Sequence, residues 1–256
     1  MADNERGMSY LEIQAYLGTT KHMGGQRTTE ELVARTQIDS QSYVLDVGCG
    51  VGATACYLAQ TYGCRVMGVD LQPGMIAHAE DRVRREGVEA LVELRVADAQ
   101  ELPFEDGTFD ATLCESVASF VEDKARVVSE LARVTRRGGY VGMNEEVWLQ
   151  PPTPAIRETA RLLWGLEAEV LTAEAWAEVL AQAGLDEIDV ETHTLDVRRE
   201  SSQLARYRFA DMWGMMRRTL SLMVKSKAFR AYMRARRAMP RGVFKYLGYA
   251  VLVGRA

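Results

Sequence analysis

The sequence predicts an α/β protein built on one seven-stranded, mostly parallel sheet, with a helical arm before the sheet and helical insertions in its second half. Between residues 43 and 148, short runs rich in β-branched residues alternate with helical stretches, which is the pattern of βαβ units. The length of 256 residues, with 47% hydrophobic and 26% charged residues, fits one large globular domain.

Strands are expected where apolar and β-branched residues run unbroken between turn residues. These runs lie at 43–47, 64–70, 91–97, 109–114, 140–148, 186–196 and 244–253. Because helical stretches separate the first five runs, we expect those strands to pair in parallel.

The helices of the first half are located by their ends. Composition predicts a helix at 53–62, and Pro73 suits the first turn of a second helix that Gly87 ends as a C-cap. A third helix begins near Asp123 and is expected to end at the basic, glycine-containing run 136–139.

The chain is expected to divide into an arm, residues 1–40, and one domain, residues 41–256. Prolines after Gln150 break the strand pattern and begin a helical insertion at about 150–171, and a longer insertion follows at 198–242. Helices are expected in this half at 155–170 and 172–183. We expect the two insertions to form a lid over the substrate.

A glycine-rich turn follows the first predicted strand. The apolar run ending at Val47 leads into Gly48, Gly50 and Gly52, and a helix begins directly after them. Glycine permits a tight reversal and a close approach of the backbone to a ligand, and a helix N-terminus presents free N–H groups. Asp70 ends the second strand about 20 residues later, where a carboxylate accepts hydrogen bonds from ribose hydroxyls. The combination predicts a site for a nucleotide-like cofactor.

Asp46 discriminates between two kinds of cofactor. The spacing of Gly48, Gly50 and Ala53 also satisfies a permissive dinucleotide fingerprint, so a nicotinamide-dependent reductase is an alternative. A carboxylate just before the turn would repel a pyrophosphate but attract an ammonium group. S-adenosylmethionine (SAM) carries an α-amino group and a ribose but no phosphate, so both Asp46 and Asp70 would find partners on it.

These residues, with Asp98-Ala99 and the run 131–139, resemble the class I SAM-dependent methyltransferases, notably the branch of ubiquinone, menaquinone and other small-molecule enzymes. The resemblance covers residues 43–148 and implies a Rossmann-like sheet and a SAM cofactor that leaves as S-adenosylhomocysteine. It implies that the methionine end is held by Asp46, Gly48, Cys49 and Gly50. It implies that Asp70 binds the ribose and that the adenine lies among Leu71, Gln72, Asp98 and Ala99. A helix cap is the structural alternative for Asp98.

Three residues are candidates for the acceptor side of the reaction. Methyl transfer is an in-line displacement with an excellent leaving group, so the protein mainly aligns the reactants, and a general base is optional. Glu115, directly after the fourth strand, points toward the cofactor edge, and His22 lies in a glycine-containing segment of the arm. Glu145, beside Glu146 on the fifth strand, is expected to face the acceptor. Each has a structural alternative, as a solvated, surface or strand-end residue.

The cysteines and histidines do not indicate a metal centre. Four cysteines show no CxxC pair and three histidines are scattered, so we expect buried, reduced thiols and no metal. No run approaches the roughly 18 apolar residues of a membrane span, and the polar start does not resemble a secretion signal, so we expect a cytoplasmic protein.

The second insertion concentrates positive charge in a chain whose net charge is −5. Residues 198–242 hold 13 Lys and Arg residues against Glu200 and Asp211, a net +11 that leaves −16 on the rest. Apolar residues recur there at helical spacing, at Phe209, Met212, Trp213, Met216, Leu220 and Met223. Three interpretations stay open: a stripe packed on the sheet, a lid lining an apolar pocket with an arginine for an acidic group, or docking on a membrane surface.

The sequence therefore predicts a SAM-dependent methyltransferase that acts on a small, partly apolar molecule with an anionic end. A membrane-associated quinone or lipid as the acceptor, or a SAM-binding sensor without turnover, are the alternatives. A nucleic-acid substrate is disfavoured because Cys114-Glu115-Ser116-Val117 stands where a base-flipping motif would follow the fourth strand. The sequence does not distinguish a monomer from a homodimer.

Overall fold

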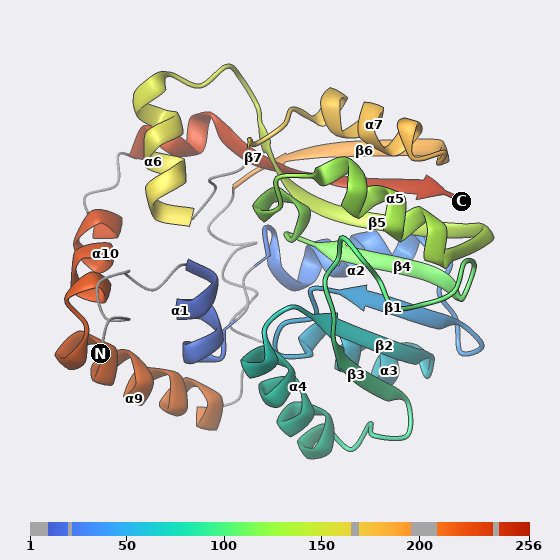
Figure 1. Ribbon diagram of the computed structural model, residues 1–256, viewed down its shortest axis with the longest axis horizontal. Helices are drawn as coiled ribbons and strands as arrows, with labels where there is room; N and C mark the ends of the chain where they lie inside the picture. Colours follow the sequence, from blue (N-terminus) through green and yellow to red (C-terminus); the bar gives the residue numbers. More distant parts are fainter. Residues whose placement is uncertain (1–9, 20–21, 165–168, 196–208, 238–240) are drawn as a thin grey trace.

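Seven strands form one mixed sheet in the order β3-β2-β1-β4-β5-β7-β6 (Figure 1). The coordinates are a computed structural model that describes residues 10–19, 22–164, 169–195, 209–237 and 241–256. The strands are β1 Tyr43–Val47, β2 Arg65–Asp70, β3 Val92–Val96, β4 Phe109–Glu115, β5 Thr135–Trp148, β6 Asp186–Thr194 and β7 Leu247–Arg255. Strands β1 to β5 pair in parallel, and β7 is antiparallel to β5 and β6. The predicted fold class is confirmed.

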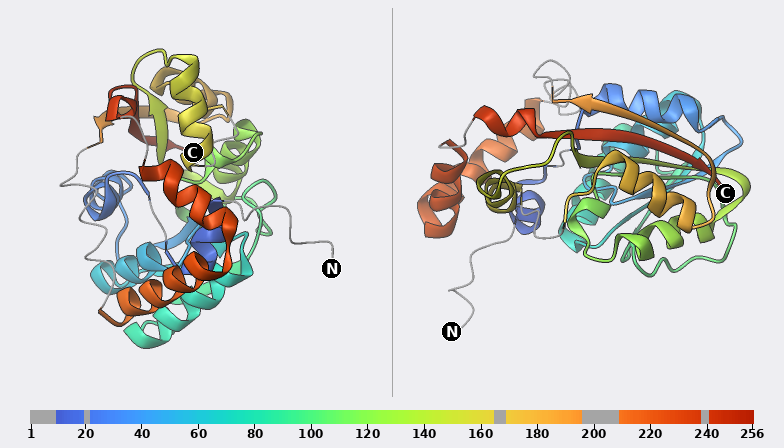
Figure 2. Two further views of the ribbon diagram at one scale, coloured as in Figure 1. Left: turned by 90° about the vertical axis from the view of Figure 1, so that its left-hand side faces the viewer. Right: turned by 90° about the horizontal axis from the view of Figure 1, so that it is seen from above.

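Five helices cover the two faces of the sheet. Helices α2 (Gly25–Arg35), α3 (Ala53–Tyr62) and α4 (Pro73–Glu86) share one apolar cluster, and α5 (Lys124–Val134) and α7 (Ala173–Gln182) share the other. Strand β1 serves both clusters, because Val44 packs on the first side and Leu45 on the second, as alternation along a strand requires. Figure 2 shows the sheet between these layers in its right-hand view.

Strand order reverses at β1. Strands β2 and β3 follow on one side of β1, whereas β4 and β5 follow on the other. The connections on the two sides therefore diverge beyond the carboxyl ends of β1 and β4, and open α/β sheets bind ligands in the crevice formed at such a point.

Two strands begin several residues away from their expected starts, and the helix expected at 155–170 is observed at Pro154–Trp164, with residues 169–170 not helical. Helix α5 ends at Val134, and β5 begins at Thr135 rather than at residue 140, because Thr135 already pairs with Phe109 of β4. Strand β7 begins at Leu247 rather than at residue 244, because the preceding residues form the short 3-10 helix η3 (Arg241–Lys245). The N–H of Tyr246 donates to the carbonyl oxygen of Val243 at the end of this helix.

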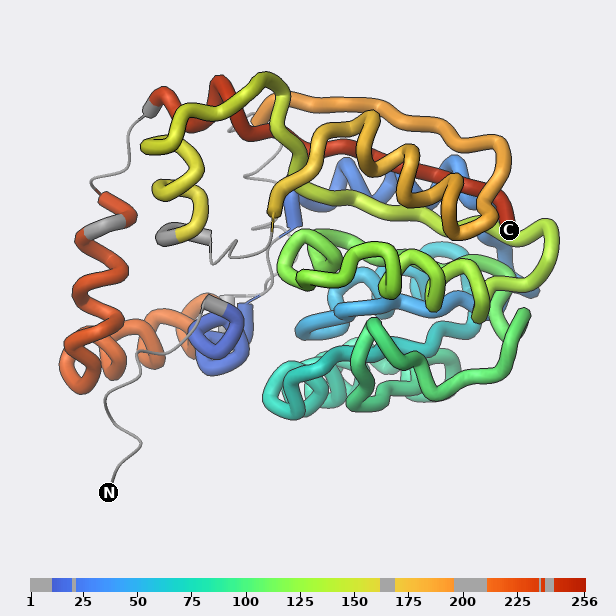
Figure 3. The backbone as a smooth tube through the Cα atoms, turned by 45° about the horizontal axis from the view of Figure 1, so that its top comes forward, coloured from blue at the N-terminus to red at the C-terminus, as the bar shows by residue number. Residues whose placement is uncertain are grey.

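The remaining helices gather beyond the carboxyl ends of the parallel strands. They are α1 (Tyr10–Leu17), α6 (Pro154–Trp164), α9 (Phe209–Lys225) and α10 (Lys227–Arg237), as Figures 1 and 3 show. Within the described ranges, no helix is long and apolar enough to cross a membrane. Of the three interpretations of the apolar stripe, packing on the sheet does not hold for α9, because Met212, Trp213, Met216 and Leu220 are exposed.

Candidate functional site

A cavity of about 470 Å³ lies at the carboxyl ends of β1, β2 and β4. Leu11 and Gln14 of α1 contribute to its wall from the opposite side. All of the residues that the sequence assigns to the cofactor line this cavity, namely Asp46, Gly48, Cys49, Gly50, Asp70, Leu71, Gln72, Asp98 and Ala99. His22 and Glu115 also line it, whereas Glu145 does not.

The glycine turn packs against Val117, which follows the end of β4. Gly48 adopts φ +71°, and a Cβ at this position would lie 2.1 Å from Cγ2 of Val117. The N–H groups of Gly48 and Cys49 donate to the carbonyl oxygen of Val69 at 2.7 and 2.9 Å. Glycine is therefore required at position 48 both for backbone conformation and for space.

Asp70 joins the glycine turn to the end of β2. Its Oδ2 accepts from the N–H of Gly50 at 3.0 Å, and its Oδ1 accepts from the N–H of Gln72 at 2.8 Å. Burial raises the pKa of this carboxyl, although both hydrogen bonds act in the opposite direction. The carboxylate is thus held at the rim of the cavity with a fixed orientation.

Asp46 and Asp98 supply two further carboxylates. Asp46 is 3% exposed and lines the cavity. Burial, and then the negative charge of Asp46, raise the pKa of the Cys49 thiol well above its ordinary value. The Oδ1 of Asp98 accepts from the N–H of Gln100 at 2.9 Å, so this residue both caps a turn and lines the cavity.

The tertiary structure brings His22 and Glu115 together. Nε2 of His22 lies 3.6 Å from Oε2 of Glu115, and both side chains are buried. Thr29 Oγ1 donates to Oε2 of Glu115 at 2.8 Å and lies 3.2 Å from Nε2 of His22. Thr54 Oγ1 donates to Oε1 of Glu115 at 2.9 Å. Sequence reasoning missed both threonines, because no local pattern marks a partner 86 or 61 residues away.

The segment that carries His22 is fastened to the sheet. The amide Nδ2 of Asn144 donates to the carbonyl oxygen of Met23 at 2.8 Å, and the Met23 N–H donates to Ser116 Oγ at 3.3 Å. Ser116 lines the cavity and adopts φ +54°, a conformation that costs free energy for a residue with a side chain. Gly24 packs tightly against Thr28 and Tyr249. A Cβ at position 24 would lie 1.8 Å from Thr28 Oγ1, so no larger residue fits there.

The expectation that Glu145 or Glu146 faces the acceptor is corrected by the structure. Glu145 is fully buried, and its carboxylate accepts from the N–H groups of Val117, Ala118 and Ser119 at 2.8–3.1 Å. It therefore caps the short 3-10 helix η1 (Ala118–Phe120). Burial, followed by the neighbouring charge of Glu146, raises the pKa of Glu145.

The described lining of the cavity is acidic and partly apolar. It includes five carboxylates and no Lys or Arg, and Leu11, Leu71, Met75, Phe120 and Val121 supply apolar surface. The described parts of the two insertions, including α6, α9 and α10, do not line the cavity, so the arginine contact that one of the three interpretations proposed is not found among them. Residues 165–168, 196–208 and 238–240 of these insertions lie outside the described residues.

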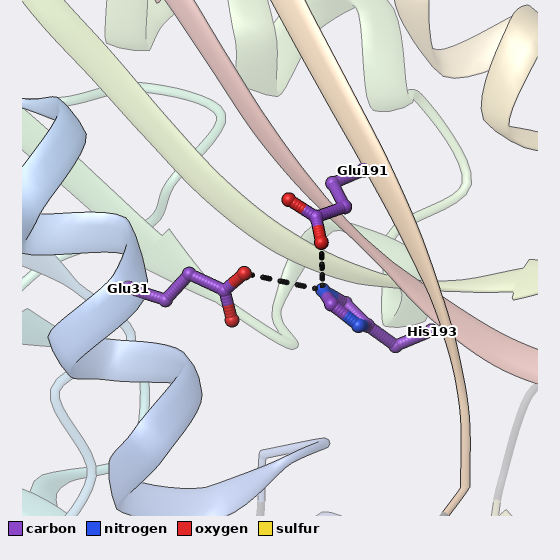
Figure 4. A group of neighbouring side chains, drawn as sticks. All are labelled: Glu31, Glu191 and His193. Carbon is purple, nitrogen blue, oxygen red and sulfur yellow. Dashed lines mark ion pairs between the residues drawn. The ribbon is translucent and has the colours of Figure 1, made fainter.

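A second polar cluster lies outside this cavity, between α2 and β6 (Figure 4). Nε2 of His193 lies 3.5 Å from Oε1 of Glu31 and 3.7 Å from Oε1 of Glu191. Three ligand atoms of this kind suit a cation, but Arg35 pairs with the same two carboxylates and with Asp189. The guanidinium already supplies positive charge there, and the cluster joins the helix to the edge strand.

The comparison with known proteins agrees with the geometry of the cavity. Residues 45–143 match a family model described as a methyltransferase domain. The chain is 39% identical over 123 residues to the methyltransferase GfsG of Streptomyces halstedii, covering 48% of this chain and 44% of that protein. It is 30% identical over 171 residues to phosphoethanolamine N-methyltransferase 1 of Zea mays, covering 67% of this chain and 33% of that protein.

A solved structure extends the similarity to nearly the whole fold. The chain is similar to the [4+2]-cyclase SpnF, with a TM-score of 0.73 and 21% identity over 96% of this chain and 91% of that one. The chain spans less than half the length of the two methyltransferase relatives. The matched domain holds the glycine turn, Asp70, Asp98 and Glu115. Residues 45–143 therefore form a methyltransferase domain, and the chain that carries it is identified with the class I SAM-dependent methyltransferases through this domain.

Proposed function

We propose that this protein transfers the methyl group of SAM to a small, partly apolar molecule. The observation that carries the proposal is the position of Asp46 and Asp70 on one cavity, at the point where strand order reverses. In the reaction, a lone pair of the acceptor attacks the methyl carbon, and the bond from that carbon to sulfur breaks. The sulfonium becomes the thioether of S-adenosylhomocysteine, and an acceptor that carries a proton releases it to a base or to water.

The residues around the cavity suit each part of SAM. The buried carboxylate of Asp46 would pair with the α-amino group, and the same carboxylate would repel a pyrophosphate. Asp70 would accept from the ribose hydroxyls, since each oxygen of a carboxylate accepts more than one hydrogen bond. Leu71 and Gln72, with Asp98 and Ala99, would enclose the adenine at the adjoining part of the wall.

The charge of the lining favours an acceptor that is neutral or cationic. Five carboxylates around a cavity of about 470 Å³ would repel an anion, and no described Lys or Arg of the lining offsets them. The acidic lining does not support the anionic end that the sequence suggested. An amine on an apolar body suits the carboxylates together with Leu11, Phe120 and Val121, and the Zea mays relative is by name an N-methyltransferase.

His22 and Glu115 would serve the proton of such an acceptor. A protonated amine has no lone pair to attack with, so a base that takes its proton accelerates transfer. His22 is the base in this proposal, and the carboxylate of Glu115, at 3.6 Å, would stabilise the imidazolium. Thr29 and Thr54 would hold Glu115 in place through their hydrogen bonds.

Calorimetric titration and a transfer assay test the proposal together. We expect S-adenosylhomocysteine and SAM to bind and NADH not to bind. With methyl-labelled SAM and a panel of apolar amines, alcohols and carboxylates, we expect label in the amines. Binding of SAM without transfer to any acceptor would favour a sensor, and binding of NADH would overturn the assignment of the cofactor.

A further inference from the structure

Helix α9 presents a continuous apolar row to solvent. Met212, Met216, Leu220 and Val224 recur every four residues and therefore share one face, with Trp213 beside them. Their exposed fractions are 39%, 44%, 59% and 80%, and that of Trp213 is 54%. Exposed apolar residues scattered singly are ordinary on a soluble protein, but a row of this length on one helix face marks an interaction surface.

The opposite face of α9 is fixed to the rest of the protein. Arg218 donates from Nε and Nη2 to the carbonyl oxygen of Leu17 at 3.0 and 2.6 Å, and Asp211 pairs with Arg85 of α4 at 3.2 Å. Leu222 is buried in a cluster with Ile13 of α1 and Phe229 of α10. The apolar row therefore faces solvent, because the opposite face of α9 packs against α1, α4 and α10.

Helices α9 and α10 are rich in positive charge. Residues 209–237 hold eight Lys and Arg residues against one acidic residue, Asp211, which is paired with Arg85. Six of the cations are exposed, and none of them forms an ion pair with another residue that the structure describes: Arg217, Lys225, Lys227, Arg234, Arg236 and Arg237. Helix α10 follows α9 after Ser226, and Arg230 fixes the corner by donating to the carbonyl oxygens of Met223 and Val224.

We infer that the α9–α10 surface, residues 209–237, docks the protein on an anionic lipid surface. An apolar helix face with Trp, Met and Leu enters the boundary between headgroups and acyl chains, and neighbouring cations pair with anionic headgroups. A nucleic acid would use the cations but leave the apolar row exposed to water. The inference is independent of the proposed reaction, since none of these residues lines the cavity.

Docking would bring the cavity close to the bilayer. Helix α1 lies between the two, because Leu11 and Gln14 line the cavity while Ile13 and Leu17 pack against α9 and α10.

Vesicle flotation tests the inference. Vesicles of phosphatidylcholine alone and of phosphatidylcholine mixed with phosphatidylglycerol are compared at low and high salt. We expect flotation only with the anionic vesicles, weakened by salt because screening reduces the attraction. The double variant Met216→Asp/Leu220→Asp and the double variant Lys227→Glu/Arg234→Glu should each lower the affinity by about tenfold or more. Tryptophan emission should shift to the blue on binding, and the shift should be lost in Trp213→Phe.

Matched variants elsewhere keep the test specific. Val96→Asp changes an exposed apolar residue on β3, and Arg136→Glu/Arg137→Glu makes the same change in charge at the start of β5, away from α9 and α10. These controls should float like the unchanged protein, and all variants should bind S-adenosylhomocysteine equally. Equal flotation with neutral vesicles, no flotation, or unchanged flotation of both test variants would overturn the inference. Self-association that Met216→Asp/Leu220→Asp abolishes, without vesicle binding, would assign the face to a second copy instead.

Discussion

Glu115 and Glu145 lie on neighbouring strands and both are buried, yet their donors differ in kind. Glu115 lines the cavity and accepts from two threonine hydroxyls, which rotate freely. Glu145 lies in the core and accepts from three backbone N–H groups, whose directions are fixed by η1, and from the hydroxyl of Ser119 at 2.7 Å. The comparison teaches that a buried carboxylate is available for chemistry when it meets a cavity, and is structural when fixed backbone donors hold it in the core.

The largest expected effect is on the stability of Glu145→Ala. The substitution leaves three backbone donors without an acceptor in the core, and we expect the free energy of unfolding to fall by about 2–4 kcal/mol. Relief of the repulsion from Glu146 keeps the loss below the sum of three separate hydrogen bonds. Urea unfolding measures the change. A loss smaller than that of Glu115→Ala would break the comparison.

Asp70→Ala extends the comparison to a second cavity carboxylate. We expect the affinity for S-adenosylhomocysteine to weaken by about 1–3 kcal/mol, because charged hydrogen bonds to the ribose are lost. Calorimetry measures the affinity, with Asp186→Ala on the exposed start of β6 as the matched control. Against an analogue that lacks the ribose hydroxyls, the variant and the unchanged protein should bind alike. A loss that persists with that analogue would mean that Asp70 acts only by fixing Gly50 and Gln72.

Glu115→Gln tests whether the Glu115 carboxylate takes part in methyl transfer. One threonine hydroxyl can turn to accept from the new amide nitrogen while the other still donates to the amide oxygen, so we expect the free energy of unfolding to change by less than about 1 kcal/mol. Turnover should fall by about tenfold because His22 loses the charge that stabilises its protonated form. The pH at which His22 limits turnover should also move to lower values. Full activity with an unshifted pH profile would remove Glu115 from the reaction.

The smallest effect is the pH dependence of cofactor binding. Burial raises the pKa of Asp70 in the free protein, and hydroxyl donors on a bound ribose would lower it again. Binding would then release a proton, so affinity should fall as the pH drops through the raised pKa. Titrations of S-adenosylhomocysteine at a series of pH values should show this fall, and Asp70→Asn should remove it. An equal fall in Asp70→Asn would assign the titration to another group.

The region from β1 to α4 could be predicted from sequence because its determinants are local. The first strand, the glycine turn and the helices at 53–62 and from Pro73 to Gly87 occur as expected. Asp46 and Asp70 lie 24 residues apart on adjacent strands, so the register of two strands is enough to bring them to one edge.

The acceptor side could not be predicted in the same way. The network around Glu115 joins the arm, α2, α3 and β4, and its hydrogen bonds connect residues 61 and 86 positions apart. Glu145 shows the converse: its place near the end of the predicted fifth strand suggested the cavity, but only the position of η1 decides that its carboxylate caps backbone groups.

Helix α9 shows most clearly which features depend on local sequence and which depend on tertiary packing. Its spacing determined that Met212, Met216 and Leu220 share a face, because 3.6 residues per turn is a property of the helix alone. The buried face of α9 is decided by contacts with other helices. Arg218 donates to the carbonyl oxygen of Leu17, and Leu222 packs with Ile13 and Phe229. The sequence by itself thus determined the strands, the turn and the carboxylates of the cofactor edge, since short-range geometry specifies them. The tertiary structure decided which carboxylate meets the cavity and which helix face meets solvent, since these depend on packing between distant parts of the chain.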